Sequence, residues 1–135
     1  MPRVYRSMYR AGDLPLVEAS AKGLGVRIPG DVSVRDGLIF PETGGMSVAP
    51  NWRILPNWRI PKRLKHLAPE AAGKDNYYCW RMSDGEFVSA PFFQGLECRV
   101  DHPEHGLIEP SEPVTPDEFQ TRLSATQCLW VIDEE

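Results

Sequence analysis

The stretch from Asp36 to Val48 limits the backbone more than any other part of this sequence. It contains a short apolar run, a turn with the adjacent glycines Gly44 and Gly45, and a second apolar run. Adjacent glycines permit a close backbone approach or a positive φ that a residue with a Cβ atom rarely adopts. Turn chemistry alone accounts for such a pattern. It predicts two short strands, at 38–40 and 46–48, on either side of a tight turn.

The length and composition indicate one domain with short elements. A chain of 135 residues can bury a single core without disulfides or metals, so residues 1–135 are expected to form one domain. The 13 prolines and 11 glycines predict many loops and few long helices. The three cysteines are scattered and form no Cys-x-x-Cys pair, which predicts free thiols. The three histidines are equally scattered, so no metal site is expected.

Membrane insertion and general nucleic-acid binding are not indicated. No apolar run reaches the roughly 18 residues that a membrane helix requires, and the first residues lack the apolar centre of a signal peptide. The net charge is -4, but it is unevenly distributed. Residues 44–69 contain Lys and Arg and no acidic residue, whereas residues 97–135 are rich in Asp and Glu. If both regions fold onto one surface, a basic cleft would face acidic walls.

Alternation, turn residues and capping signals predict the remaining elements. Strands are expected at 4–9, 77–82, 96–100 and 105–110. Helical structure is expected at 14–24, 62–67 and after the capping box at 115–118. The apolar spacing of the last helix predicts one buried face, formed by Phe119, Leu123, Gln127 and Trp130. Residues 83–86 are predicted to turn the chain into a hairpin with 87–88.

The unit Pro-Asn-Trp-Arg-Ile occurs twice, starting at Pro50 and again six residues later. Two copies are too few for a solenoid, so we interpret them as a duplication in a surface loop. The sequence leaves two roles open for Trp52 and Trp58. Their indoles would stack on a base or nicotinamide ring while the neighbouring arginines bind a phosphate, or they would pack in the core. Interleaved aromatic residues are more often part of a core.

Four segments together carry a resemblance to a known family. They are Tyr5-Arg6, the run from Arg35 to Leu38, the run from Pro41 to Val48, and His105 with its following Ile108, Pro110 and Pro113. In this order they resemble the small type VI secretion toxin effectors whose fold is similar to that of ADP-ribosyltransferases. Met46 departs from the family pattern, which has a threonine at this position.

The resemblance implies site residues and a substrate. It places Arg6 on the phosphate or ribose of NAD, and it matches Ser47 and His105 to the serine and histidine of the family. Breaking the bond between nicotinamide and ribose develops positive charge on the ribose, which a carboxylate stabilises. Glu109 is our own candidate for that carboxylate. The predicted catalytic residues are therefore Ser47, His105 and Glu109, and the predicted NAD-binding residues are Arg6, Gly44, Gly45 and Ser47.

The resemblance also implies a fold and a biological role. The expected fold is α+β, ADP-ribosyltransferase-like, with a split or strongly bent, mainly antiparallel sheet and few helices. The expected function is that of an antibacterial toxin, an NAD-dependent ADP-ribosyltransferase or an NAD glycohydrolase. It would be held inactive in the producing cell by a cognate immunity protein and act in the cytoplasm of a target cell. A secretion apparatus or a larger delivery protein would carry it, as a free effector or as a C-terminal part, and the macromolecular acceptor stays open.

Two other functions are compatible with the sequence. One is a small ribonuclease toxin that uses His105 with Lys62, Arg63 and Lys65 on phosphate. The other is a non-catalytic module that binds a partner through the loop at 52–60. His66 and His102 match nothing in the family pattern and are assigned no role.

Overall fold

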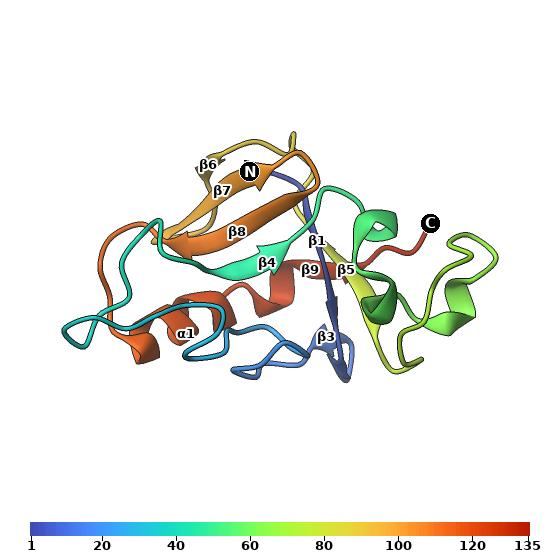
Figure 1. Cartoon of the computed structure of the whole chain (residues 1–135), viewed down its shortest axis with the longest axis horizontal. Helices are drawn as coiled ribbons and strands as arrows, with labels where there is room; N and C mark the ends of the chain where they lie inside the picture. The colour runs from blue at the N-terminus through green and yellow to red at the C-terminus, as the bar shows by residue number, and fades with distance from the viewer.

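A split antiparallel sheet forms the framework of the molecule. The computed structural model describes residues 1–135. One sheet has the strand order β1-β5-β9, from β1 (Val4–Met8), β5 (Tyr78–Met82) and β9 (Trp130–Ile132). The other has the order β4-β8-β7-β6, from β4 (Met46–Val48), β8 (His105–Pro110), β7 (Leu96–His102) and β6 (Ala90–Pro91) (Figure 1). The α+β class and the split, mainly antiparallel sheet are therefore confirmed.

The two sheets meet at one point, between Tyr5 of β1 and Ala49 at the end of β4. Each of these residues donates its backbone N–H to the carbonyl of the other, at 2.8 and 2.9 Å. The strands do not pair beyond this bridge, because β1 pairs with β5 while β4 pairs with β8. The sheet thus opens between β1 and β4 next to Tyr5 and Ala49.

The helix predicted at 14–24 is wrong. The chain instead forms a small hairpin of β2 (Arg10–Ala11) and β3 (Leu14–Pro15), followed by bends. Its backbone amides bind carbonyls across turns: Leu16 donates to Tyr9, and Leu24 donates to Leu16. These hydrogen bonds replace the ones between residues four apart that a helix would need.

The C-terminal helix, α1 (Pro116–Ser124), starts where the sequence predicts. The hydroxyl of Thr115 accepts a hydrogen bond from the amide of Glu118 at 3.1 Å, as the capping box requires. Phe119 and Leu123 are fully buried on the helix, but the helix ends before the two other residues of the predicted face. Gln127 lies in the 3-10 helix η4 (Gln127–Leu129), and Trp130 begins β9.

Two further predictions fail at strand edges. Residues 38–40 form isolated bridges to Arg35 and Val114 and no regular strand. Residues 87–88 do not form a hairpin with β5, because β1 and β9 already occupy both edges of that strand. The residues at 83–86 indicate that the chain turns here, but they do not indicate which strand pairs with β5.

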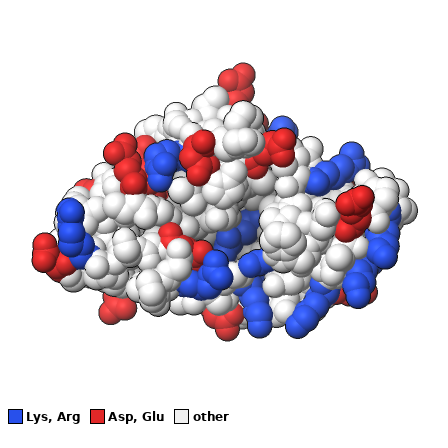
Figure 2. Space-filling view, viewed as in Figure 1, with Lys and Arg blue, Asp and Glu red and all other residues white.

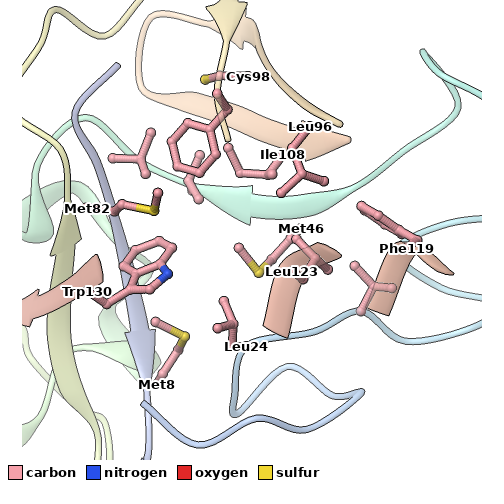
Figure 3. Packing of buried hydrophobic residues seen from close by; sticks show 14 of the residues in the cluster. Met8, Leu24, Met46, Met82, Leu96, Cys98, Ile108, Phe119, Leu123 and Trp130 are labelled. Atoms are coloured by element: carbon pink, nitrogen blue, oxygen red, sulfur yellow. The ribbon is translucent and has the colours of Figure 1, made fainter. Parts of the chain in front are cut away.

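The core consists of two clusters on opposite faces of β1 and β5, because Val4 and Met8 belong to the larger cluster and Tyr5 and Cys79 to the smaller one. The larger one fills the space between the two sheets and α1 with 18 buried residues, among them Met8, Leu24, Met46 and Trp130 (Figure 3). The smaller one lies under the loop after β4 and includes Trp52. Met46 faces the larger cluster at 1% exposure, so the family's threonine is replaced here at a core position.

The loop after β4 contains three single-turn 3-10 helices. They are η1 (Trp52–Ile54), η2 (Asn57–Arg59) and η3 (Lys62–Leu64), and the last confirms a helical turn within 62–67. The C-terminal residues pack next to this loop, where the carboxylate of Glu134 pairs with Arg63 at 2.7 Å and Trp52 donates to the carbonyl of Glu135 at 3.0 Å. The three cysteines are free, and Cys79 and Cys98 are buried. None of the helices has the length and apolar character that crossing a membrane requires.

Candidate functional site

A cleft of about 440 Å³ lies where the sheet splits. Its lining comes from β1 and β4, from the loop after β4, from the bends around residues 21–31, and from the turn between β7 and β8. Figure 2 shows this face hollowed near its centre, with Lys and Arg atoms in the hollow. The predicted site residues in the lining are Arg6, Ser47 and His105.

Arg6 is a buried cation in the cleft lining. Only 7% of the residue is exposed, and its guanidinium donates to backbone carbonyls: from Nη1 to Ser47 at 2.8 Å, and from Nε and Nη2 to Gly23 at 3.2 and 3.1 Å. It forms no ion pair. Burial, reinforced by the positive charge of Arg59, lowers the pKa of Arg6 to about 10, so that the side chain is still charged at neutral pH.

Two more arginines add positive charge to the cleft. Arg59 donates from Nη1 to the carbonyl of Ala21 and forms no ion pair. Arg27 pairs with Asp31 through contacts of 2.8 and 3.3 Å, so its charge is largely compensated. Arg6 and Arg59 are therefore the two guanidinium groups of the cleft that have no carboxylate partner.

Ser47 lies in the middle of β4 and presents its side chain to the cleft. Met46 and Val48 on either side are buried, as strand alternation requires. The carbonyl of Ser47 accepts from Arg6, while its hydroxyl makes no hydrogen bond within the chain. The hydroxyl is free for a ligand.

His105 is oriented by a carboxylate. Its Nδ1 lies 2.7 Å from Oδ1 of Asp101, across the turn between β7 and β8. This contact leaves Nε2 as the free ring nitrogen. His102, in the same turn, also lines the cleft, and its Nδ1 accepts from the amide of Glu104 at 3.1 Å. A histidine to which the sequence assigns no role is thus part of the site.

Glu109 does not line the cleft. It is 4% exposed, and its Oε2 accepts from the amide of Glu42 at 2.9 Å and from Nε of Arg99 at 3.1 Å. These contacts join the loop before β4 to β7 and β8. The predicted catalytic role of Glu109 gains no support from this position, because its carboxylate is buried, paired and absent from the cleft lining.

Gly44 and Gly45 also lie outside the lining. A Cβ atom on Gly44 would come within 2.2 Å of the carbonyl oxygen of Asp31, and one on Gly45 within 2.5 Å of that of Ile108. The amide of Gly45 donates to the carbonyl of Asp31 at 3.1 Å, so it is occupied within the protein. Close packing explains both glycines, and their predicted role in NAD binding gains no support.

Several cleft residues were not selected from the sequence. Glu104 and His102 line the cleft, and Asp101 contacts His105; the sequence of this segment indicates only a polar turn. Trp58 and Arg59 lie in the second copy of the repeated unit, where the sequence leaves a stacking role and a core role open. The strand pairing that brings these segments together is long-range, so no local pattern identifies them.

The basic residues that a ribonuclease mechanism would require do not lie in the cleft with His105. Lys62, Arg63 and Lys65 are absent from the cleft lining, and Arg63 is neutralised by Glu134 through contacts of 2.8 and 2.7 Å. A catalytic arrangement of His105 with these three cations is therefore not formed. No cluster of three or more His, Cys, Asp or Glu side chains has the proximity that metal binding requires.

One of three comparisons with known proteins found a match. Searches among curated proteins and among solved structures gave none. A family model described as Tse2 ADP-ribosyltransferase toxin matches residues 6–129, a range that begins within β1 and includes β4 and the histidine turn. The chain therefore belongs to the Tse2 ADP-ribosyltransferase toxin family.

Proposed function

We propose that this toxin binds NAD in the cleft between β1 and β4 and breaks the bond between nicotinamide and ribose. The ADP-ribosyl group would pass to a macromolecular acceptor, or to water if the protein acts as an NAD glycohydrolase. The observation that carries the proposal is the buried guanidinium of Arg6, which lies in the cleft without a carboxylate partner.

The buried positive charge of Arg6 has only carbonyl partners, which favours the binding of an anionic ligand. Guanidinium groups bind phosphate oxygens through strong charge-assisted hydrogen bonds. The pyrophosphate of NAD carries two such charges, and Arg6 and Arg59 provide two unpaired guanidinium groups in one cleft. The residues present therefore fit a dinucleotide better than a neutral substrate.

The other cleft residues would act on the ribose and the acceptor. The free hydroxyl of Ser47 would donate to or accept from a ribose hydroxyl. His105, with Nδ1 held by Asp101, would remove a proton from the acceptor through Nε2. This is the arrangement in which a carboxylate fixes the tautomer and orientation of a general base.

The carboxylate that stabilises positive charge on the ribose should line the cleft. Asp31 and Glu104 meet this condition, and Glu109 does not. Asp31 is already paired with Arg27, whereas the carboxylate of Glu104 has no hydrogen bond or ion pair within the chain. We therefore assign the electrostatic role to Glu104 in place of Glu109.

The biological setting is also part of the proposal. The toxin would be delivered by a type VI secretion system, alone or as part of a larger protein, and act in the cytoplasm of a competing bacterium. A cognate immunity protein in the producing cell would block the cleft. An acidic surface on that protein would complement the cleft arginines.

The test combines toxicity with chemistry. Wild type and the variants Arg6→Ala, Ser47→Ala and His105→Ala are expressed in a bacterium, and nicotinamide release from NAD is measured with the purified proteins. The proposal expects growth arrest and nicotinamide release from the wild type, and loss of both in the variants at unchanged folding by circular dichroism. Folded variants that all remain toxic would refute this site, and RNA cleavage without nicotinamide release would support the ribonuclease alternative.

A further inference from the structure

The two copies of Pro-Asn-Trp-Arg-Ile place their tryptophans in opposite environments. Trp52 is 1% exposed, packs in the smaller core cluster and donates from Nε1 to the carbonyl of Glu135. Trp58 is 67% exposed and lines the cleft. The same five-residue unit thus supplies one core residue and one surface residue.

The exposure of Trp58 is unusual within this protein. The three other tryptophans, Trp52, Trp80 and Trp130, are between 1% and 2% exposed, and each donates its indole N–H to an acceptor in the protein. Large aromatic side chains gain free energy by burial, so an exposed indole at a cleft indicates a surface that a ligand covers.

The neighbours of Trp58 in the cleft define what kind of ligand suits it. Ile54, Leu55 and Pro56 provide apolar lining from the same loop, and Arg59 follows directly in the sequence. The guanidinium of Arg59 has a carbonyl partner and no carboxylate. A flat ring attached to a phosphorylated sugar would meet an apolar surface and a cation side by side.

The first copy of the unit lacks this combination. Arg53 packs with its Cζ 5.2 Å from the centroid of the Trp52 ring, and neither residue lines the cleft. The chain therefore contains its own comparison: the same Trp-Arg pair occurs once with the indole buried and the arginine exposed away from the cleft, and once with both residues in the cleft lining.

We infer that Trp58 is the platform on which one planar ring of the bound nucleotide stacks, with Arg59 on the phosphate next to that ring. The inference rests on the proposed function and adds the residues that select for a base. Stacking on an aromatic side chain accepts any flat heterocycle, so adenine and nicotinamide share the chemistry required. Arg59 would add a charge-assisted contact that a base alone does not provide.

The fluorescence of Trp58 gives a direct test, because it is the one tryptophan that iodide can reach readily. ADP-ribose carries the adenine end of NAD, nicotinamide mononucleotide carries the other end, and pyrophosphate carries neither ring. We expect ADP-ribose or nicotinamide mononucleotide to reduce iodide quenching at least threefold, and pyrophosphate to leave Trp58 accessible. The nucleotide that protects identifies the ring. If neither nucleotide protects Trp58, the inference is overturned.

Matched variants separate stacking from general effects of mutation. Trp58→Ala should weaken binding of the protecting nucleotide at least tenfold by calorimetry, whereas Trp58→Phe should weaken it less than threefold. Arg59→Ala should also weaken binding at least tenfold, and Arg53→Ala, the equivalent change in the first copy, should not. Wild-type affinity in Trp58→Ala would overturn the inference.

Failure of the stacking platform and failure of the proposed reaction give different results. Nucleotide binding that depends on Trp58, without nicotinamide release, would support the platform and contradict the proposed reaction. Nicotinamide release that is unchanged in Trp58→Ala would support the reaction and contradict the platform.

Discussion

The Nη1 of Arg6 donates to the carbonyl of Ser47 over 2.8 Å and so connects β1 to β4 just where the two strands separate. This contact holds a positive charge in the cleft lining. Strand β4 presents the Ser47 hydroxyl to the same space. The backbone and the side chain of Ser47 thus serve the site in two ways: the carbonyl positions Arg6 and the hydroxyl faces the ligand.

An anion should stabilise the protein through Arg6. Pyrophosphate that binds only the folded state raises the free energy of unfolding, by about 2.7 kcal/mol at a concentration of 100 times Kd. We expect pyrophosphate to raise the Tm of the wild type and to raise that of Arg6→Met much less, because only Arg59 then remains in the cleft without a carboxylate partner. Sodium chloride at equal ionic strength is the control, and Arg35→Met, a change outside the cleft, should behave as wild type. An equal Tm shift in Arg6→Met would show that the anion binds elsewhere.

Glu109 and Glu104 should have opposite phenotypes. Glu109→Gln removes the charge that pairs with Arg99, and we expect it to cost about 1–2 kcal/mol of unfolding free energy. This is less than for a fully buried pair, because Arg99 is 30% exposed. Urea denaturation measures the loss, and nicotinamide release at low temperature should stay near the wild-type rate.

Glu104→Gln is the matched change at the cleft. It should alter the unfolding free energy by less than about 0.5 kcal/mol, since the side chain has no partner to lose. Its rate of nicotinamide release should fall at least tenfold. The reverse result, a stable but inactive Glu109→Gln and an active Glu104→Gln, would return the catalytic carboxylate to Glu109.

Asp101 should act through the orientation of His105. Asp101→Asn keeps a group of the same size but removes the carboxylate 2.7 Å from Nδ1. We expect kcat for transfer to fall about tenfold while KM for NAD stays within twofold, because the histidine acts on the acceptor. A change in KM alone would indicate that His105 binds NAD and does not remove a proton from the acceptor.

Acid should weaken the contacts that hold the C-terminus. Burial raises the pKa of Asp133, but hydrogen bonds from Tyr5, from the amide of Glu135 and from Arg81 outweigh it, and the net pKa is lowered. A carboxylate with a lowered pKa in the folded state stabilises the protein above its unfolded pKa of about 3.9. That contribution is lost as the pH falls through the lowered value.

The unfolding free energy of the wild type should therefore decrease below about pH 4. Asp133→Asn should be less stable at pH 7 and should show a smaller decrease with acid. Thermal unfolding between pH 3 and pH 7 measures how the unfolding free energy of each protein changes with pH. Parallel slopes in the two proteins would assign the acid sensitivity to other carboxylates.

Local signals in the sequence were sufficient for elements whose hydrogen bonds are local. The capping box at Thr115 predicts the start of α1, and the apolar run after the glycine turn predicts the short strand at 46–48 that the structure contains as β4. The helix expected at 14–24 fails because its backbone groups pair with Tyr9 and with one another across turns. The proline and glycines at the two ends of residues 14–24 are compatible with a helix and with a hairpin.

The site was only partly predictable for the same reason. Arg6, Ser47 and His105 were found through the family pattern, and the structure brings all three to one cleft. Glu109 is our own candidate for the carboxylate that stabilises charge on the ribose, but in the structure it binds the amide of Glu42 and Arg99 and is not part of the cleft lining. The sequence predicts the turn that holds Asp101, but the place of this turn beside the cleft depends on the pairing of β8 with β4, which are distant in the sequence. Trp58 lies in the loop after β4, and no local signal in that loop selects it over Trp52.

The most direct test of the central claim is the rate at which the purified protein releases nicotinamide from NAD, compared between wild type and Ser47→Ala. Ser33→Ala and His66→Ala change a serine and a histidine outside the cleft and serve as controls. The account predicts release by the wild type and both controls, and a rate at least tenfold lower for Ser47→Ala and for His105→Ala. Equal rates in all folded variants, or no release by the wild type, would contradict it.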